Sequence, residues 1–398
     1  MAAFKAMIKN TIKSLHIENL LSFGPKSPPV ELGDLNVLIG PNGSGKSNFI
    51  EILGLLRSTP KDLAAEIGDG GGITELLWKG WKNGKTAAVA FVEVVASPAG
   101  ISETLRYSLK FTKVGPSFKI LDERIENDRR DPAYEKAYLY YDYAGGRPVL
   151  NVAEKQRHLR REEVNAQQSI LSQRQDPDQY PEVTYLGRFF SSFHLYRDWA
   201  FGPGSEIRNL YGSELKTDFL EEDISNLGLM LNRMRGEAKS EFLEYLRMFY
   251  AGAEDIYTKI VGGLVDLRVE EAGDISIPAS RLSDGTLRWL SLLAILLNPA
   301  PPPLVCIEEP ELGLHPDIIR PLAELLIKAS ERMQLVVTTH SDSLVDELSG
   351  NPSSVIVCEK KDGSTVARQL DNAKLKEWLE RYTLGQLWRT GKIGGNRW

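Results

Sequence analysis

Cysteine is scarce in this sequence, which excludes two kinds of site. The 398 residues include two cysteines, Cys306 and Cys358, and each lies inside an apolar, strand-like run. No C-x-x-C pair occurs, so neither a zinc hook nor a dithiol redox pair is available. We therefore expect both thiols to be buried and reduced.

A strong charge and a long apolar run are also missing. The formal net charge of −6 argues against a broadly basic nucleic-acid surface, although a local basic patch is compatible with it. No apolar run is long enough to span a membrane, and the N-terminus lacks the apolar core of a signal peptide. We expect a cytoplasmic protein that does not interact with a membrane.

Histidine is equally sparse, with 5 residues in the chain. Three of them have no carboxylate or cysteine partner at the spacing of a metal site, and we assign them no role. These are His16, His158 and His194.

The order of apolar patterns predicts an α/β fold. Residues 86–125 read as β-strands separated by turn residues, which indicates an antiparallel β lobe. From residue 303 to residue 359, strand-like runs alternate with helix-like runs, which indicates a mostly parallel central sheet flanked by helices. Residues 150–176 are polar and charged but lack a sustained heptad pattern, so we expect a short helical insertion and no long coiled coil.

These patterns divide one predicted unit, 1–398, into three parts. They are an N-terminal lobe over 1–149, a helical arm over 150–210 and a C-terminal lobe over 211–398. The final residues, 384–398, are rich in glycine and aromatic side chains and could either fray or dock. We favour a frayed end because chain termini are commonly poorly ordered.

The segment GPNGSGKS, residues 40–47, matches the phosphate-loop pattern G-x4-G-K-[ST]. An apolar run precedes it and a helical pattern follows, which is the context that this motif requires. Glycines let successive backbone N–H groups point at phosphate oxygens, while Lys46 reaches the β- and γ-phosphates and the Ser47 hydroxyl binds Mg²⁺. The predicted nucleotide-binding residues are Gly40, Asn42, Gly43, Ser44, Gly45, Lys46, Ser47 and Asn48.

Two carboxylates end the apolar run LVCIEE, which is the layout of a Walker B motif. Glu308 would support Mg²⁺ directly or through water, and Glu309 would be the general base that orients the attacking water. Aspartate is usual at the first position, and the extra methylene of Glu308 puts direct ligation in question.

A histidine follows the next strand-like run, in VVTTHSD. His340 is placed to donate a hydrogen bond to a γ-phosphate and to sense its departure, and it joins Lys46 and Glu309 as a predicted catalytic residue. His315, in ELGLHP, has a weaker case, and we expect it to pack or to line a subunit contact.

The segment LSDGT, residues 282–286, is a second helix N-terminus that is suited to bind a phosphate group. Ser283 offers a hydroxyl, Gly285 allows close backbone approach, and the helix N-terminus carries a partial positive charge. A capped core helix explains Ser283 and Asp284 but leaves Gly285 without a reason, because glycine lowers helix stability.

In this order, GPNGSGKS, LSDGT, LVCIEEPELGLHP and TTHSD resemble the ABC-type ATPases of the SMC/RecF/OLD group. The resemblance implies a P-loop ATPase head with ATP and Mg²⁺ as cofactors. It also implies that LSDGT is a signature motif, so Ser283 and Gly285 would close over ATP held by a second subunit in a homodimer or a higher oligomer. The family's Q-loop glutamine is Gln168 or Gln173, and Phe23 either lies near the nucleotide or fills the core.

Spacing narrows the choice within that group. More than two hundred positions separate Lys46 from Ser283, too many for a transporter subunit, and we expect neither long coiled coils nor a TOPRIM domain. The chain is therefore similar to stand-alone ATPase subunits of two-component bacterial anti-phage systems, which work with a separate effector, a nuclease or TOPRIM-type protein encoded nearby. The alternative is a RecF-like DNA-repair ATPase that binds DNA directly.

Overall fold

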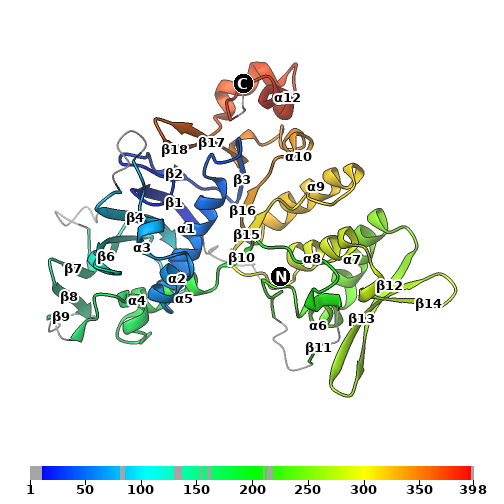
Figure 1. Cartoon of the computed structure of the whole chain (residues 1–398), viewed down its shortest axis with the longest axis horizontal. Coiled ribbons are helices and arrows are strands. Elements are labelled where there is room, and N and C mark those ends of the chain that lie inside the picture. Colours follow the sequence, from blue (N-terminus) through cyan, green and yellow to red (C-terminus); the bar gives the residue numbers. More distant parts are fainter. Residues whose placement is uncertain are drawn as a thin grey trace, which may run out of the picture.

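A computed structural model describes residues 11–80, 86–129, 137–152, 155–158, 163–208, 211–212 and 218–395. The described strands form three sheets, and the helices lie around and between them (Figure 1). One sheet is the N-terminal lobe, the second carries the phosphate loop, and the third is a small sheet beneath α8 (Asp284–Leu296).

The N-terminal lobe is an antiparallel sheet with the strand order β2-β1-β4-β5-β6-β7-β8-β9, which confirms the predicted β lobe. Its strands show buried positions in alternation with exposed or half-buried ones, as expected for a sheet with one face on the core. The strands are β1 (Thr11–Glu18), β2 (Val30–Glu31), β4 (Val89–Ser97), β5 (Leu105–Val114), β6 (Ser117–Asn127), β7 (Leu139–Ala144), β8 (Arg147–Val152) and β9 (Lys155–His158).

The central sheet has the order β10-β15-β16-β3-β17-β18, and every pair in it is parallel except β17 with β18. This confirms the mostly parallel sheet, and β3 and β16 are buried along their whole length, as continuous apolar runs predict. The strands are β3 (Leu35–Ile39), β10 (His194–Tyr196), β15 (Leu304–Glu308), β16 (Gln334–Thr338), β17 (Val355–Lys361) and β18 (Ser364–Gln369).

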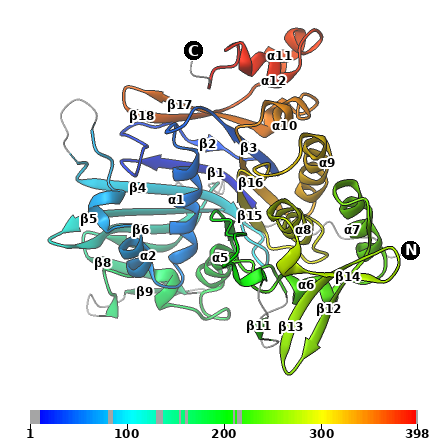
Figure 2. The ribbon, with the colours of Figure 1, turned by 45° about the vertical axis from the view of Figure 1, so that its right-hand side comes forward.

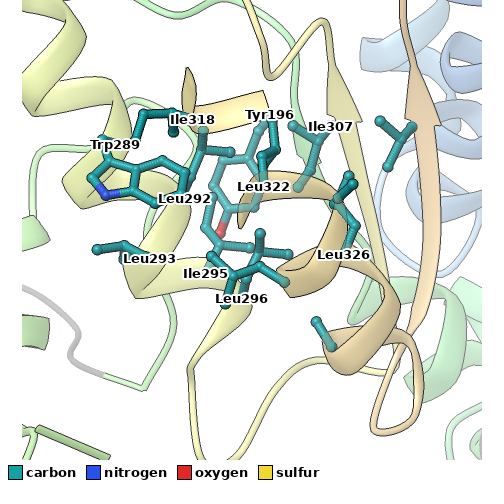
Figure 3. Close-up of a cluster of buried hydrophobic side chains, with 14 of the residues drawn as sticks. Tyr196, Trp289, Leu292, Leu293, Ile295, Leu296, Ile307, Ile318, Leu322 and Leu326 are labelled. Atoms are coloured by element: carbon teal, nitrogen blue, oxygen red, sulfur yellow. The ribbon is translucent and has the colours of Figure 1, made fainter. Parts of the chain in front are cut away.

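The central sheet separates two hydrophobic cores because successive side chains of a strand point to opposite faces. Leu304 and Cys306 join the core that contains α1 (Lys46–Ser58) and the N-terminal lobe. Val305 and Ile307 join the core formed with α8 and α9 (Ile319–Ser330). Figure 3 shows Ile307 and Tyr196 among the side chains of these two helices.

The third sheet follows the order β11-β13-β12, with β14 paired to β13, and it leads into α8. Figure 2 shows β12 and β13 extending from the body of the protein as a long hairpin. The strands are β11 (Tyr211–Gly212), β12 (Ala253–Val261), β13 (Leu264–Glu271) and β14 (Ile275–Pro278), and the preceding helices are α6 (Leu227–Arg233) and α7 (Gly236–Phe249).

The predicted helical arm is wrong in its first part. Residues 147–152 and 155–158 are strands that extend the lobe sheet, and helix appears only in α4 (Ile170–Gln173) and α5 (Pro181–Ser191). Polar residues fit here because β9 pairs only with β8 and ends the sheet in the described residues. The division of the unit at residues 150 and 210 stays a prediction.

A buried carboxylate fixes the start of α4. Glu123, on β6, accepts hydrogen bonds from the Tyr107 hydroxyl (2.9 Å), the Ile170 amide (2.9 Å) and the Ser169 hydroxyl. Burial raises the pKa of Glu123 to about 7. The short helix α4 is thus attached to the interior of the lobe and does not project as an arm.

The C-terminal residues dock, so the expectation of a frayed end is wrong through residue 395. After α11 (Asn372–Leu379), helix α12 (Leu384–Arg389) packs against α10 (Asp342–Asp346), and Trp388 is buried. Figures 1 and 2 show α12 above β17, on the same side as α10. The aromatic side chain supplies enough apolar contact to hold a glycine-rich segment in place.

Two further expectations concern composition. Cys306 and Cys358 are both buried and free, as expected. Among the residues that the structure describes, no helix combines the length and the apolar character needed to cross a membrane.

Candidate nucleotide site

The phosphate loop joins β3 to α1, as the sequence predicts. Gly45 has φ 103°, in the left-handed region that favours glycine, and a Cβ there would lie 2.3 Å from Thr365 Oγ1. Gly40 lies as tightly against the backbone, since a Cβ would lie 2.2 Å from the Cys358 carbonyl oxygen. Strands β17 and β18 thus hold the loop in a conformation that requires glycine at both positions.

The loop presents donors suited to an anion. Helix α1 begins without a side-chain cap, so no capping side chain pairs with the backbone amides of its first turn. The Ser44 hydroxyl is buried and has no hydrogen-bond partner among the described residues. A phosphate group would satisfy both.

Lys46 completes this cradle. Its ammonium group donates to the carbonyl oxygens of Gly40 (2.8 Å) and Pro41 (3.3 Å), so it lies folded over the loop. Burial lowers the pKa of Lys46, and the nearby carboxylates of Glu309 and Glu308 act in the opposite direction. A buried, hydrogen-bonded ammonium at this point is ready to transfer its bonds to phosphate oxygens.

The remaining loop residues differ in exposure. Asn42, Gly43 and Ser47 are exposed, and Asn48 is half-buried in the first turn of α1. Contact of Asn42 and Asn48 with a nucleotide stays a prediction.

Ser47 and Glu308 form an oxygen pair beside the loop. The Ser47 hydroxyl donates to Glu308 Oε2 at 3.3 Å, and Glu308 is the last residue of β15. A hydroxyl and a carboxylate are ligands that Mg²⁺ accepts together with phosphate oxygens and water. The two side chains therefore fit a magnesium ion bound with a nucleotide, although no group of three or more potential ligands occurs among the described residues.

Arg197 binds the other oxygen of Glu308, with Nε 3.1 Å from Oε1. Sequence reasoning missed this residue. Strand β10 runs parallel to β15, with Tyr196 opposite Ile307, so the residue after β10 reaches the carboxyl end of β15. The Trp199 indole N–H donates to the Glu308 carbonyl oxygen at 3.1 Å and fixes the same position from the main chain.

Gln173, one of the two glutamines proposed for the Q-loop, has other partners. The Gln173 amide group binds the carbonyl oxygens of Asn165, Gln168 and Ser169, which closes the loop before α4. Arg197, and not a glutamine, is the residue that follows the strand next to β15 and contacts Glu308. Only the pairing of β10 with β15 would have pointed to it.

Glu309 has a backbone conformation that is rare for its residue type. Its φ is 45°, in the left-handed region, and its N–H donates to the Thr338 carbonyl oxygen at 3.0 Å. Strain of this kind is retained mainly where the surrounding structure needs a side chain in a particular place. Glu309 Oε1 lies 3.5 Å from His340 Nε2, so the structure brings together the two residues predicted as base and sensor.

Glu311 supports this pair, and sequence reasoning missed it as well. Its Oε1 accepts hydrogen bonds from the Thr339 hydroxyl (2.6 Å) and from the His340 amide (2.9 Å). The carboxylate thereby ties the segment after β15 to the end of β16. In the sequence, Glu311 is one of the acidic residues that follow β15. Nothing in that run distinguishes it from an acidic residue on the surface.

The LSDGT turn is exposed at Ser283 and Asp284. Ser283 caps its own helix, since its hydroxyl oxygen accepts a hydrogen bond from the Thr286 amide at 3.1 Å. Asp284 pairs with Arg208. The turn therefore begins α8 with a complete side-chain cap, unlike the phosphate loop.

Gly285 has a local packing role, which corrects the argument that a core helix leaves it unexplained. A Cβ at this position would lie 2.7 Å from the Gly313 carbonyl oxygen and 3.3 Å from the Phe249 ring. The glycine allows α8 to contact the segment that follows Glu309. Its presence alone thus carries no evidence for a partner's phosphate.

Arg288 joins the same two segments. Its guanidinium group donates to the Glu309 carbonyl oxygen at 3.2 Å and lies over the rings of Trp199 (5.1 Å) and Phe201 (5.4 Å). Stacking on two aromatic faces helps to hold this half-buried charged group in place. The first turns of α8 are thus connected to the backbone of the predicted base.

A cavity of about 670 Å³ lies between the phosphate loop and the segments that carry Glu309 and His340. Gly40, Pro41 and Asn42 line one side, and Glu309 and His340 line another. Neither Ser283 nor Gly285 is among its described lining residues. A larger cavity of about 800 Å³ lies between α2 (Leu63–Asp69) and residues 218–223, away from the loop, and we assign it no chemistry.

The other candidate residues are not brought into the site. Phe23 is 2% exposed and packs against Phe49, so it belongs to the core. His315 is exposed and lies 3.2 Å from Asp317, at the start of the turn before α9. A role of His315 in a subunit contact stays a prediction.

Comparisons with known proteins agree with this geometry. A family described as "AAA domain, putative AbiEii toxin, Type IV TA system" matches residues 35–346. No curated protein matches the chain.

Solved structures of Smc heads are similar in fold. A head bound to the C-winged helix domain of ScpA shares 17% identity over 91% of this chain and 99% of that chain, with a TM-score of 0.54. A head with an extended coiled coil from Pyrococcus furiosus, bound to the C-terminal domain of ScpA, shares 16% identity over 93% and 99%, with a TM-score of 0.54. A head with a coiled coil and joint from Pyrococcus yayanosii shares 12% over 93% and 99%, with a TM-score of 0.51.

The family match spans the phosphate loop, the LSDGT turn, Glu308 and Glu309 at the end of β15, and His340, and the fold is that of a P-loop ATPase head. The chain belongs to the family described as "AAA domain, putative AbiEii toxin, Type IV TA system", and its fold is similar to that of the Smc heads.

Proposed function

We propose that this protein binds ATP with Mg²⁺, hydrolyses it to ADP and phosphate, and uses the cycle to switch a separate effector. The observation that carries the enzymatic part is the strained Glu309, held 3.5 Å from His340 beside a phosphate loop. A carboxylate placed at such cost next to an anion cradle suits a general base for water.

The chemistry follows from the positions of these side chains. Glu309 accepts a proton from water, the water oxygen forms a bond to the γ-phosphorus, and the bond from that phosphorus to the β,γ-bridging oxygen breaks. Lys46 and the loop amides stabilise the negative charge, and His340 donates to a γ-phosphate oxygen. Ser47 and Glu308 would hold Mg²⁺, which neutralises charge on the phosphate oxygens.

A homodimer around two ATP molecules, or a tightened preformed dimer, is the second part of the proposal. The exposed Ser283 and Asp284, on a turn outside the cavity of their own subunit, support it. In the family that the chain resembles, such a turn closes over the nucleotide of a partner. Higher oligomers built on this pair are compatible with the same contact.

The biological part of the proposal is a sensor or switch in bacterial anti-phage defence, with a nuclease or TOPRIM-type effector as partner. The family description names a toxin of a type IV toxin–antitoxin system, which supports a two-component arrangement. Two of the similar Smc heads were solved with a partner protein, ScpA, which supports the use of such a head as a docking platform.

The enzymatic proposal is tested by ATP hydrolysis and ATP binding measured in parallel. The native chain should release phosphate, Lys46→Ala should lose both ATP binding and turnover, and Glu309→Gln should bind ATP without turnover. Arg381→Ala, an exposed change outside the cavity, is the matched control and should behave as the native chain. A native chain that binds no ATP would overturn the proposal.

The biological proposal needs a separate experiment. Expression of the chain with the product of its neighbouring reading frame should reduce phage plaques, and Lys46→Ala should abolish this effect. A RecF-like repair ATPase is the alternative, and tight, ATP-dependent and salt-sensitive binding of duplex DNA by the isolated chain would favour it instead.

A further inference from the structure

The C-terminal segment 384–395 forms one wall of the cavity that contains the phosphate loop. Trp388, Arg389 and Gly395 line this cavity together with Gly40 and Glu309. A Cβ at Gly395 would lie 3.6 Å from the Cα of Gly40, so the segment lies directly against the first glycine of the loop.

This wall is built into the protein by specific hydrogen bonds. At the start of α12, the Leu384 amide donates to Ser349 Oγ (2.9 Å) and the Gly385 amide donates to Asp346 Oδ1 (2.8 Å). At its end, the Trp388 indole N–H donates to the Gly395 carbonyl oxygen at 2.8 Å. The backbone that carries Arg389 is therefore fixed from both sides.

The segment's link to β17 comes from the Gly395 amide, which donates to Glu359 Oε1 at 2.9 Å. Helix α12 also lies close to α10, because a Cβ at Gly385 would lie 2.3 Å from the Asp342 carbonyl oxygen. Since α10 begins two residues after His340, α12 is held next to the predicted γ-phosphate sensor.

Arg389 gives this wall its charge. It is the one lysine or arginine among the described residues that line the cavity, whereas Glu309 and Asp342 contribute two carboxylates. Its Nε lies 3.2 Å from Asp342 Oδ2, and both side chains are substantially exposed. An exposed ion pair of this kind contributes little to stability, so the guanidinium group can change partner at small cost.

We propose that Arg389 is a phosphate-binding residue that leaves Asp342 and binds the terminal phosphate of a nucleoside triphosphate in the same subunit. An anion that enters between Glu309 and Asp342 needs a compensating cation, and a guanidinium group is the donor best matched to phosphate oxygens. The inference rests on the proposed ATP binding and adds a C-terminal group to that site.

The ligand class follows from the position of the group. Arg389 and His340 line the cavity with the first residues of the phosphate loop, where the terminal phosphate would extend. A diphosphate has no group at that point. Arg389 should therefore distinguish ATP from ADP and leave affinity for the shared part of the nucleotide unchanged.

The test is calorimetric titration of ATP and ADP, each with Mg²⁺, into the full chain carrying Glu309→Gln to prevent turnover. Arg389→Ala should weaken ATP binding about tenfold, the value of one charge-assisted hydrogen bond at an exposed position, and leave ADP binding unchanged. Arg389→Lys should fall between the two. Arg381→Ala, which removes an equal charge outside the cavity, should change neither affinity, and all variants should unfold at the native temperature.

Three results would overturn the inference. Unchanged ATP affinity in Arg389→Ala would place the residue outside the site, and an equal loss for ATP and ADP would make its effect structural. If the chain without a change at Arg389 binds no ATP, the proposed function fails as well. If ATP binds but its affinity does not depend on Arg389, only this inference is refuted and the proposed ATP binding stands.

Discussion

Replacement of Gly285 by alanine is a direct test of how α8 is joined to the catalytic segment. A methyl group there would lie 2.7 Å from the Gly313 carbonyl oxygen, whereas ordinary contacts begin at 3.4 Å. The neighbouring Phe249 ring, at 3.3 Å, leaves little room for α8 to move sideways. Either α8 or the segment 311–314 must therefore shift by about 0.7 Å, a distance that follows from these contacts.

The expected free-energy change combines two opposing effects. Overpacking against a backbone carbonyl costs about 1–3 kcal/mol, and the higher helix propensity of alanine returns at most about 1 kcal/mol. We therefore expect Gly285→Ala to lower the free energy of unfolding by about 1–2 kcal/mol. Since the segment 311–314 begins two residues after Glu309, its displacement should also move Glu309, and turnover should fall further than ATP binding.

Gly68→Ala supplies the matched control. Gly68 lies in α2, and a Cβ there would meet no atom within 4 Å, so this alanine should stabilise the protein by about 0.5–1 kcal/mol. Chemical denaturation followed by fluorescence, with phosphate release in parallel, measures both variants. If Gly285→Ala stabilised the protein as Gly68→Ala does and kept full turnover, the contact with Gly313 would have no role.

Three further predictions concern separate parts of the molecule. Burial raises the pKa of Glu123 to about 7, so its protonated form stabilises the fold below about pH 4.5, and this contribution of about 3 kcal/mol is lost as the pH rises through 7. Glu123→Gln should therefore flatten the pH profile of the free energy of urea unfolding between pH 5 and 8. An unchanged profile would refute the assignment. Arg197→Gln removes a cation whose Nε lies 3.1 Å from Glu308, so a titration should show that ATP binding needs a several-fold lower Mg²⁺ concentration. If ATP binding needed a higher Mg²⁺ concentration instead, Arg197 would chiefly position the Glu308 carboxylate. Ser283→Arg should keep ATP binding but lose turnover, and full activity in a phosphate-release assay would contradict the role of the turn in a partner's site.

The fold was predictable where local patterns have one interpretation. Short continuous apolar runs bounded by polar or turn residues, such as 304–307 and 335–337, favour buried strands, and the glycine spacing at 40–45 suits a phosphate loop. The edge strand β9 escaped prediction because edge strands need few apolar residues, and the end of β8, its pairing partner, was missed with it.

The site was predictable only for residues that belong to short motifs. Lys46, Ser47, Glu308, Glu309 and His340 all have motif positions, and the structure brings them around one loop. Arg197 and Arg389 reach the site through strand order and terminal docking, and neither leaves a local signal in the sequence. Gly285 shows the reverse case, since its motif suggested a partner's phosphate while its closest neighbour is Gly313 of the same chain.

Closure of two heads around ATP can be measured by sedimentation velocity of Glu309→Gln, which should keep its nucleotide bound. With ATP and Mg²⁺ the variant should sediment as a dimer, or a preformed dimer should become resistant to dilution, and Ser283→Arg in the same background should abolish this response. A Glu309→Gln protein that binds ATP and remains a monomer at every concentration would show that two heads do not close around the nucleotide.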